Sequence, residues 1–472
     1  MSVKNTRLGA EGIAAALQGK KNIFFIGIGG ISMSSLAMIT ARRGLRVGGY
    51  DRTRTALTKE LERMGIAVHD SADAAHLDGY GAVVYTVAIP EQHVEYAEAK
   101  RRGLPLISRS DYLGYLMLDY TQRIGIAGSH GKSTATCMCA QILMSAMCDP
   151  TVMSGAPMRS MGGAFRLGQR HHMVFEACEY KDSFLDFNPT VAVVLNCELD
   201  HVDYFKSMAQ IRASFAAFAD RAGRDGCVVY NADDEETRIA MRDVVARRVT
   251  FGIEDATADY RATGIDLTGG YASFDLWYKN RPLGRVKLGV PGRHNVYNAL
   301  AAAAATHECG LCSRDIVQGL SDFEGAVRRM EYKGKLSGAV VFDDYGHHPT
   351  EVKATLAEAR ELGTGRLICA FQPHTYSRTA TLFEDYVQAL SVADAVVVAP
   401  IYAARETDDC GVSAVKLAEA INTCVGRELA RGCEDMAPVA RALCDLAQPG
   451  DVVIVMGAGN IDSVFVGLPM EN

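Results

Sequence analysis

A short loop between an apolar strand and a helix constrains the fold of this chain more than any other feature. Residues 123–127 are apolar enough for a buried strand, residues 128–134 read Gly-Ser-His-Gly-Lys-Ser-Thr, and residues 135–147 contain few helix breakers. Glycines at such a turn let phosphates approach the helix N-terminus, where backbone N–H groups and the helix dipole favour negative charge. The loop is therefore predicted to hold nucleotide phosphates, with Lys132 as a mobile cation and Ser133 as a Mg²⁺ ligand.

The spacing of this loop departs from the strict phosphate-loop pattern, which has a glycine five positions before Gly131. Ile126 occupies that position, and the nearby glycines are Gly125 and Gly128. A glycine- and serine-rich turn with a solvated lysine has the same residues. The choice between these interpretations depends on residues further along the chain.

Length and charge narrow the class of protein. A chain of 472 residues is expected to form about three domains. Its 49 basic and 56 acidic residues give a net charge of −7 without a long basic run, which argues against a nucleic-acid partner. No apolar run approaches the roughly 18 residues that span a bilayer, so no membrane insertion is expected. Thirteen scattered cysteines fit free thiols in a reducing cytoplasm, and Cys309 and Cys312 form a CxxC without partners for zinc.

Alternating strand and helix patterns indicate an α/β protein with three domains. We predict a Rossmann-like domain over residues 1–120, a central phosphate-loop domain that binds a nucleotide over 121–325 and a Rossmann-like C-terminal domain over 326–472. The central sheet is expected to be mostly parallel, with small antiparallel strands where residues 260–290 change to a two-residue period. Predicted strands of the three domains include residues 23–27, 47–50, 82–87, 105–107, 173–177, 191–195, 339–342, 366–371, 395–399 and 451–456.

Polar side chains follow the strands of the predicted central domain. Glu176 ends one strand, and Asn196 follows the next, with His201 shortly after it. Ligands bind at the carboxyl ends of strands in such sheets, and a carboxylate with an imidazole beside a triphosphate suits a divalent metal. Glu179 and Asp182 are expected to lie past the strand as surface or supporting groups.

A second glycine turn opens the first domain. Residues 27–34 read Gly-Ile-Gly-Gly-Ile-Ser-Met-Ser after a strand and before a helix, and Asp51 ends the next strand. Ser32 replaces the third glycine of the dinucleotide fingerprint, so NAD and another diphosphate ligand remain equal alternatives. Asp51 either meets a ribose hydroxyl or caps its own turn.

Two neighbouring strand ends of the predicted third domain carry histidine, tyrosine and arginine. Residues 343–350 read Asp-Asp-Tyr-Gly-His-His-Pro-Thr, and residues 371–378 read Phe-Gln-Pro-His-Thr-Tyr-Ser-Arg. Either cluster by itself could be explained without a ligand, because loops are often polar and an aspartate often caps a helix. Two such clusters at corresponding positions predict one wall of a substrate site.

Taken together and in this order, these motifs resemble those of the Mur ligases over nearly the whole chain. The resemblance rests on residues 128–134, Glu176, 196–201, 292–299, 344–349 and 457–461, and within the family on residues 27–34, 371–374 and the double histidine. It implies a UDP-binding N-terminal domain, a central ATPase domain and a C-terminal domain that helps bind ATP and an amino acid. The implied reaction uses ATP and Mg²⁺ to phosphorylate the lactyl carboxylate of UDP-N-acetylmuramate, and the amine of L-alanine then attacks the acyl phosphate.

The resemblance also implies a role for each matching residue. It makes Lys132, Glu176 and His201 catalytic, and it makes Ser133, Glu176 and His201 metal ligands. The implied ATP-binding residues are Gly128, Ser129, His130, Gly131, Lys132, Ser133, Thr134, Asn196, His294, Asn295, Asn298, Arg329 and Asp344. The UDP-sugar would contact Gly27, Gly29, Gly30, Ser32, Met33, Ser34, Asp51 and Arg109. The amino acid would contact Tyr345, His347, His348, His374 and Arg378.

Some positions depart from the family pattern. Thr375 stands where many members have arginine, Cys178 and Tyr180 replace an aspartate and a serine, and Ser129 replaces a threonine. The expected enzyme is a cytoplasmic monomer or weak homodimer. Three alternatives remain: a ligase that attaches a murein tripeptide to the same UDP-sugar, a non-catalytic nucleotide-binding regulator and an NAD-dependent dehydrogenase.

Overall fold

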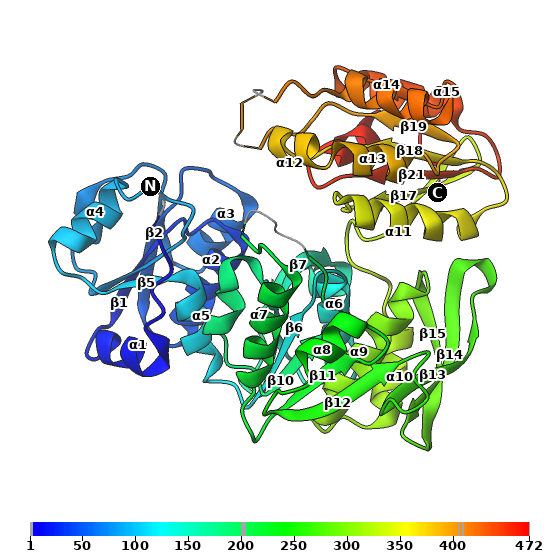
Figure 1. Cartoon of the computed structure of the whole chain (residues 1–472). Helices are drawn as coiled ribbons and strands as arrows, with labels where there is room; N and C mark the ends of the chain where they lie inside the picture. Colours follow the sequence, from blue (N-terminus) through cyan, green and yellow to red (C-terminus); the bar gives the residue numbers. More distant parts are fainter. Residues whose placement is uncertain (1–2, 200–203, 405, 408–409, 472) are drawn as a thin grey trace. The chain divides into compact units, whose positions relative to one another are not determined.

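The protein is an α/β protein with three β-sheets, as seen in a computed structural model that describes residues 3–199, 204–404, 406–407 and 410–471 (Figure 1). Most strand pairs are parallel, and antiparallel pairs occur in the second and third sheets. The predicted fold class is confirmed. No helix in this described part of the chain combines the length and apolar character needed to cross a bilayer.

The first sheet is fully parallel and follows the order β3-β2-β1-β4-β5. The order reverses at β1, and the carboxyl end of β1 leads into the glycine turn at a point where such sheets bind ligands. The strands are β1 (Asn22–Ile26), β2 (Arg46–Tyr50), β3 (Ala67–His69), β4 (Ala82–Tyr85) and β5 (Leu106–Ser108). The helices are α1 (Gly9–Leu17), α2 (Ile31–Arg42), α3 (Ala56–Arg63), α4 (Val94–Arg101) and α5 (Arg109–Met117).

The second sheet has the order β15-β14-β13-β12-β11-β10-β6-β9-β7-β8. Its centre, β10-β6-β9, is parallel and fully apolar in its middle, so three strand ends meet around the phosphate loop. The strands are β6 (Gln122–Ala127), β7 (Thr151–Met158), β8 (Gly163–Arg166), β9 (His172–Glu176), β10 (Val191–Val194), β11 (Cys227–Asn231), β12 (Arg247–Gly252), β13 (Tyr260–Asp266), β14 (Tyr271–Tyr278) and β15 (Arg281–Pro291). The helices are α6 (Lys132–Ser145), α7 (Met208–Asp220), α8 (Glu235–Ala240), α9 (His294–Glu308) and α10 (Ser313–Ser321).

The third sheet has the order β16-β17-β21-β18-β19-β20, in which only the pair β16 and β17 is antiparallel among its described strands. The strands are β16 (Glu331–Leu336), β17 (Ala339–Asp344), β18 (Leu367–Phe371), β19 (Ala395–Val398), β20 (Ala430–Gly432) and β21 (Val452–Met456). The helices are α11 (Pro349–Ala359), α12 (Tyr376–Thr381), α13 (Phe383–Leu390), α14 (Ala414–Val425) and α15 (Met436–Leu446).

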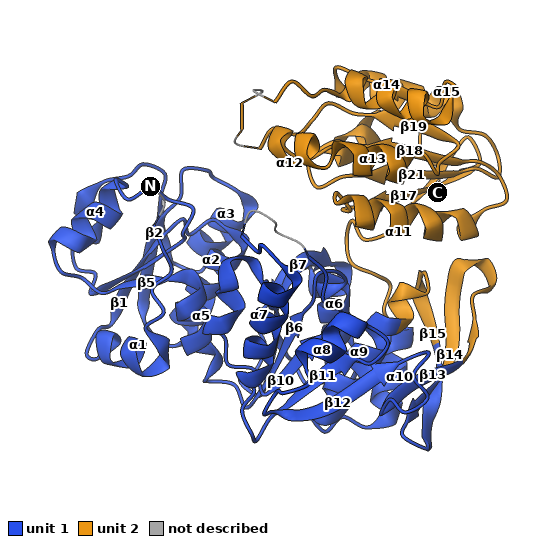
Figure 2. Cartoon of the chain, viewed as in Figure 1, with its two compact units in different colours: residues 1–263, 275–286, 297–322 blue, residues 264–274, 287–296, 323–472 orange. Residues whose placement is uncertain are grey.

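The chain divides into two compact units (Figure 2). The first unit contains residues 1–263, 275–286 and 297–322, and the second contains residues 264–274, 287–296 and 323–472. One hydrophobic core joins the first two sheets, since it includes Phe25 from β1 and Phe184 from the segment after β9. Close backbone packing joins them as well, because a Cβ on Gly114 of α5 would lie 1.9 Å from the carbonyl oxygen of Asp186.

Helix α6 begins earlier than the sequence pattern predicts. The predicted helix starts at residue 135, whereas α6 starts at Lys132 and ends at Ser145. Gly131 adopts a left-handed conformation with φ 83° directly before it, a conformation that glycine takes without a steric penalty. Lys132 and Ser133 therefore lie in the first helical turn, where backbone N–H groups have no intrahelical acceptor.

Candidate active site

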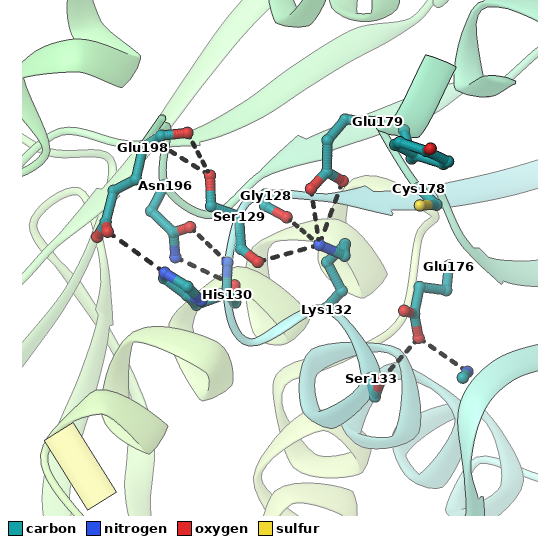
Figure 3. Close-up of polar contacts among 12 residues, drawn as sticks. Gly128, Ser129, His130, Lys132, Ser133, Glu176, Cys178, Glu179, Asn196 and Glu198 are labelled. Atoms are coloured by element: carbon teal, nitrogen blue, oxygen red, sulfur yellow. Dashed lines mark hydrogen bonds and ion pairs between the residues drawn. The ribbon is translucent and has the colours of Figure 1, made fainter. Parts of the chain in front are cut away.

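The loop between β6 and α6 has the backbone of a phosphate site (Figure 3). Gly128 and Gly131 both have positive φ angles, 148° and 83°. Gly131 also needs its lack of a side chain, because a Cβ there would lie 2.5 Å from Asn298 Oδ1 on α9. The turn delivers Lys132, Ser133 and Thr134 into the first turn of α6, so the helix N-terminus opens at the carboxyl edge of the sheet.

Side chains that follow β10 hold this loop in place (Figure 3). Asn196 Oδ1 accepts a hydrogen bond from the backbone N–H of His130 at 2.8 Å, and Asn196 Nδ2 donates to the carbonyl oxygen of His130 at 3.1 Å. The hydroxyl of Ser129 lies 2.9 Å from the backbone nitrogen of Glu198, and Glu198 Oε2 lies 3.3 Å from His130 Nε2. The amide of Asn196 thus contacts the backbone of the loop at two points.

Lys132 is drawn back onto its own loop. Its ammonium group donates to the carbonyl oxygens of Gly128 at 2.5 Å and Ser129 at 3.1 Å, and it pairs with Glu179 at 3.2 Å. Burial lowers the pKa of Lys132, but the Glu179 carboxylate and its neighbours outweigh this effect, so the pKa lies above its ordinary value. The lysine is therefore a mostly buried cation beside the expected phosphates.

Glu179 was expected to be either a surface group or a supporting group, and the structure shows that it is not on the surface. Glu179 is fully buried and contacts Lys132. Lys181 and Asp182 have positive φ angles, so the chain bends just past Glu179. Asp182 points elsewhere and accepts hydrogen bonds from the hydroxyls of Tyr204 and Ser214. Both acids follow the same strand, so residue type and position did not distinguish them.

Two of the three proposed metal ligands lie in contact. Ser133 Oγ donates to Glu176 Oε2 at 2.8 Å, and the same oxygen accepts the backbone N–H of Gly155 at 2.8 Å. Hydroxyl and carboxylate oxygens are donors that Mg²⁺ prefers, and this pair lies at the helix N-terminus, so these residues fit a magnesium ion. The third predicted ligand, His201, lies outside the described residues. Within the residues described, no group of three or more histidine, cysteine, aspartate or glutamate side chains is arranged to hold a metal.

The glycine turn of the first sheet is built around Asp51. Asp51 Oδ2 accepts the backbone N–H of Gly29 at 2.9 Å, which ties the end of β2 to the turn. Gly27 has φ 82°, and Gly30 directly precedes α2. The carboxylate of Asp51 therefore supports the glycine turn, whether or not it also contacts a ribose.

The three predicted contacts that follow this turn are placed differently from one another. Met33 is packed in the hydrophobic core, and Ser34 is buried with its hydroxyl donating to the carbonyl oxygen of Ile31. Ser32 instead lines a cavity and accepts a hydrogen bond from Arg109 Nη1 at 3.1 Å. Of these three side chains, only that of Ser32 is placed to meet a ligand in that cavity.

This cavity lies inside the first unit and has a volume of about 250 Å³. Ser32 and Arg109 line it from the first sheet, and Gly155, Glu176 and Cys178 line it from the second. Surrounding protein raises the pKa of the Cys178 thiol to about 11, although the side chain is open to the cavity. The lining of the cavity thus includes a guanidinium, that of Arg109, and the candidate metal ligand Glu176.

The predicted adenine contacts on α9 fall in both units. Asn298 belongs to the first unit and lies against Gly131 of the phosphate loop. Asn295 and His294 belong to the second unit, where Asn295 donates to the carbonyl oxygen of Pro291 at 2.6 Å. His294 Nδ1 lies 3.0 Å from a carboxylate oxygen of Glu358.

Two predicted nucleotide contacts lie beside β17 in the second unit. Asp344 is buried, and its carboxylate accepts backbone N–H groups of Met330 and Gly346 at 2.8 Å each. Burial raises the pKa of this carboxyl. The guanidinium carbon of Arg329 lies 5.1 Å from the ring centroid of Tyr345, so Arg329 and Asp344 share one end of the strand.

The predicted amino-acid residues of the second unit form an aromatic group. The ring of His347 lies 5.8 Å from that of Tyr345 and 5.6 Å from that of His374, measured between centroids. Burial, followed by the charges of His347 and Arg378, lowers the pKa of His374 to about 4. His374 is therefore a neutral imidazole at neutral pH.

Two further residues complete the description of this group. His348 caps α11, since its Nδ1 accepts the backbone N–H of Thr350 at 3.4 Å. Tyr402 was not predicted, yet its ring stacks on His374 at 5.6 Å. Tyr402 lies four residues past the end of β19, so the rule that polar groups after strands mark a site would have found it.

Comparison with known proteins places this geometry in a family. Residues 22–121 match the family model described as "Mur ligase family, catalytic domain", residues 126–306 match "Mur ligase middle domain", and residues 328–459 match "Mur ligase, glutamate ligase domain". The chain is 41% identical to UDP-N-acetylmuramate–L-alanine ligase of Caldicellulosiruptor bescii, covering 93% of this chain and 96% of that protein. It is 42% identical to the enzyme of the same name from Lachnospira eligens, covering 94% and 96% of the two chains.

Solved structures show the same fold. The crystal structure of UDP-N-acetylmuramate–alanine ligase from Thermotoga maritima matches with a TM-score of 0.77 at 27% identity, covering 94% of this chain and 97% of that one. A murein peptide ligase from Psychrobacter arcticus matches with a TM-score of 0.68 at 24% identity, covering 95% and 98%.

Proposed function

This chain belongs to the Mur ligase family, and we propose that it catalyses the ATP-dependent joining of L-alanine to UDP-N-acetylmuramate in peptidoglycan precursor synthesis. Relatives at 41 and 42% identity over more than nine-tenths of the chain carry that activity in their names. It is an amide-forming ligase.

One observation carries the proposal beyond the names of relatives. The phosphate loop and the glycine turn of the first sheet both belong to the first unit. Glu176 lines the same cavity as Ser32 and Arg109. Glu176 in turn contacts Ser133 of the phosphate loop at 2.8 Å. A carboxylate held in this cavity would lie beside the γ-phosphate, which is the juxtaposition that phosphoryl transfer between them requires.

The residue types fit an acyl-phosphate route. A carboxylate is a poor electrophile, so its oxygen first attacks the γ-phosphorus of ATP and ADP leaves. The nitrogen of L-alanine then attacks the carbonyl carbon, the amine loses a proton, and the tetrahedral intermediate expels inorganic phosphate to leave an amide. Lys132 is proposed to neutralise charge on the phosphoryl oxygens during the first step. When bound by Ser133, Glu176 and His201, Mg²⁺ would supply further charge neutralisation.

The remaining assignments extend the proposal to the second unit. We assign Arg329, Asp344, His294 and Asn295 to ATP, and the group of Tyr345, His347, His348, His374 and Arg378 to L-alanine. Division of the chain at residues 120 and 325, a monomer or weak homodimer and a cytoplasmic location are proposed with it. The proposed use of ATP and a nucleotide sugar supports the cytoplasmic location.

The test is ADP release by the purified protein with ATP and Mg²⁺, with each substrate left out in turn. We expect release only when UDP-N-acetylmuramate and L-alanine are both present. Replacing L-alanine by a murein tripeptide tests the alternative ligase, and NADH oxidation tests a dehydrogenase. Release that depends on the tripeptide and not on L-alanine would overturn the assignment.

A further inference from the structure

The surroundings of Lys132 contain one group that the proposed mechanism does not use. Two of the three acceptors of its ammonium group are carbonyl oxygens of the loop, from Gly128 and Ser129. The third is the carboxylate of Glu179, and both of its oxygens lie 3.2 Å from the lysine nitrogen (Figure 3). Glu179 is therefore the one side chain among these three acceptors.

Burial makes this pairing costly to break. Lys132 has 14% of its side chain exposed, and Glu179 has none. A buried ion pair is hard to break because removal of one partner leaves the other charge without compensation in a medium of low polarity. Pairing to Glu179 thus restricts the positions that the flexible lysine side chain can take.

The segment that carries Glu179 also carries other parts of the site. Glu176, three residues earlier, contacts Ser133, and Cys178 lines the cavity. The last residue of β9 and the short segment after it therefore place the candidate metal ligand, a wall of the cavity and the partner of Lys132. Asp182 continues the same segment but contacts Tyr204 and Ser214 instead of the lysine.

We propose that Glu179 is a positioning residue, which holds the Lys132 ammonium group at the border between the phosphate loop and the substrate cavity. On this proposal, phosphoryl oxygens replace the loop carbonyls as acceptors when ATP binds, and Glu179 remains the third acceptor. Glu179 acts through Lys132 and does not itself touch the reacting atoms. The inference rests on the ligase function proposed above.

A role through Lys132 predicts a particular kinetic signature. Glu179→Gln keeps the shape and an acceptor oxygen but removes the charge, so we expect kcat for ADP release to fall on the order of 100-fold, the cost of misplacing a catalytic group by about 1 Å. The KM for ATP should change by less than about threefold, since an interaction made mainly in the transition state affects kcat. Glu179→Asp, which keeps the charge, should recover part of kcat.

A double-mutant cycle separates this role from a merely structural one. We expect Glu179→Gln to change the rate by less than about threefold in a Lys132→Ala background, because residues that act as a unit are not additive. Single-turnover ADP formation with enzyme in excess keeps the slow variants measurable. Asp182→Asn is the matched control, and any effect it has should be the same in both backgrounds. Thermal melting checks that each variant folds, and Glu179→Asp replaces Glu179→Gln in the cycle if the latter does not.

The outcomes are distinct. An equal loss of rate from Glu179→Gln in both backgrounds, or a raised KM with unchanged kcat, overturns the positioning role. Lack of ADP release by the wild-type protein with both substrates would instead overturn the proposed function. In that case a double-mutant cycle in thermal stability still tests the pairing on which the inference rests, because Glu179→Gln and Lys132→Ala are coupled only if the two side chains interact. Additive losses of stability would overturn the inference.

Discussion

Ser133 Oγ donates a hydrogen bond to Glu176 Oε2 at 2.8 Å, which joins the first turn of α6 to the end of β9. The two residues are far apart in sequence, and neighbouring parallel strands bring them together because β6 pairs with β9 in register. The contact links the phosphate loop to the wall of the cavity that Ser32 and Arg109 also line, and the first two predictions depend on it.

Substitution of Glu176 should weaken magnesium use. Glu176→Gln removes the negative charge while keeping the hydrogen bond to Ser133 possible, so we expect the Mg²⁺ concentration for half-maximal ADP release to rise at least about tenfold, the cost of a lost charged ligand contact. A titration of ADP release against Mg²⁺ measures it. An unchanged magnesium dependence would count against Glu176 as a ligand.

Gly155 offers a way to move Glu176 without replacing it. A Cβ at this position would lie 2.5 Å from Glu176 Oε2, so Gly155→Ala must displace the carboxylate. We expect a raised magnesium requirement similar in direction to that of Glu176→Gln. Gly163→Ala in β8 is the matched control, because a Cβ there meets no atom within 4 Å. Equal magnesium curves for both alanine variants would refute the prediction.

Loss of Lys132 should affect the chemistry more than any other single change. Lys132→Ala removes the cation expected beside the γ-phosphate, and we expect ADP release to fall by several orders of magnitude, roughly 1,000-fold or more. Rates of ADP release at saturating ATP measure the effect. The assignment fails if ADP release persists undiminished in this variant.

Asp51 should matter for the UDP-sugar through the glycine turn. Asp51→Ala removes the acceptor of the Gly29 N–H, and a lost hydrogen bond to a charged group corresponds to about 10-fold or more in affinity. We therefore expect KM for UDP-N-acetylmuramate to rise by about that factor while KM for L-alanine stays unchanged. Asp70→Ala is the control, since Asp70 pairs with Arg54 on the surface of the same sheet. A normal KM for the UDP-sugar in Asp51→Ala would contradict this.

His172 should make the first unit less stable in acid. Burial, followed by the charge of His171, lowers the pKa of His172 to about 4 in the folded protein, below the value of about 6.5 in an unfolded chain. The unfolded state therefore binds more protons between these values, and stability falls as pH falls through that window, by up to about 1.4 kcal/mol per pH unit.

Calorimetric melting at about pH 7 and about pH 5 checks this window. In the wild-type protein the melting temperature should fall between the two pH values, and in His172→Leu this fall should be smaller. His171→Gln, at the exposed neighbouring histidine, should keep most of it, because burial is the larger cause of the shift in His172. An equal drop in His172→Leu and the wild-type protein would show that this histidine does not contribute.

Most elements that carry the site were predictable from the sequence. The strands before the glycine turn and before the phosphate loop, and the strands that end near Glu176 and Asp344, lie within a few residues of their predicted bounds. Such predictions succeed because buried parallel strands need continuous apolar runs and because glycines mark turns with positive φ. The start of α6 was missed by three residues, since a helix that begins directly after a left-handed glycine has no usual cap signal.

Side-chain destinations were harder to predict. Glu179 and Asp182 follow the same strand and are both acidic, yet one pairs with Lys132 and the other with two hydroxyls. The packing of the segment after β9 decides between them, and no local residue pattern reveals that packing. Met33 and Ser34 likewise follow the glycine turn of the first sheet, but both are buried in α2.

The sequence by itself determined the kind of site, because a glycine turn before a helix, a lysine and a set of polar strand ends in fixed order specify local backbone and chemistry. Tertiary structure alone decided that the first two sheets share one hydrophobic core and one cavity, and that Glu179 lies against Lys132. The physical reason is the distance along the chain over which each feature is determined. Turns and periodicity depend on a few consecutive residues, whereas the ion pair between residues 132 and 179 depends on how separate segments pack.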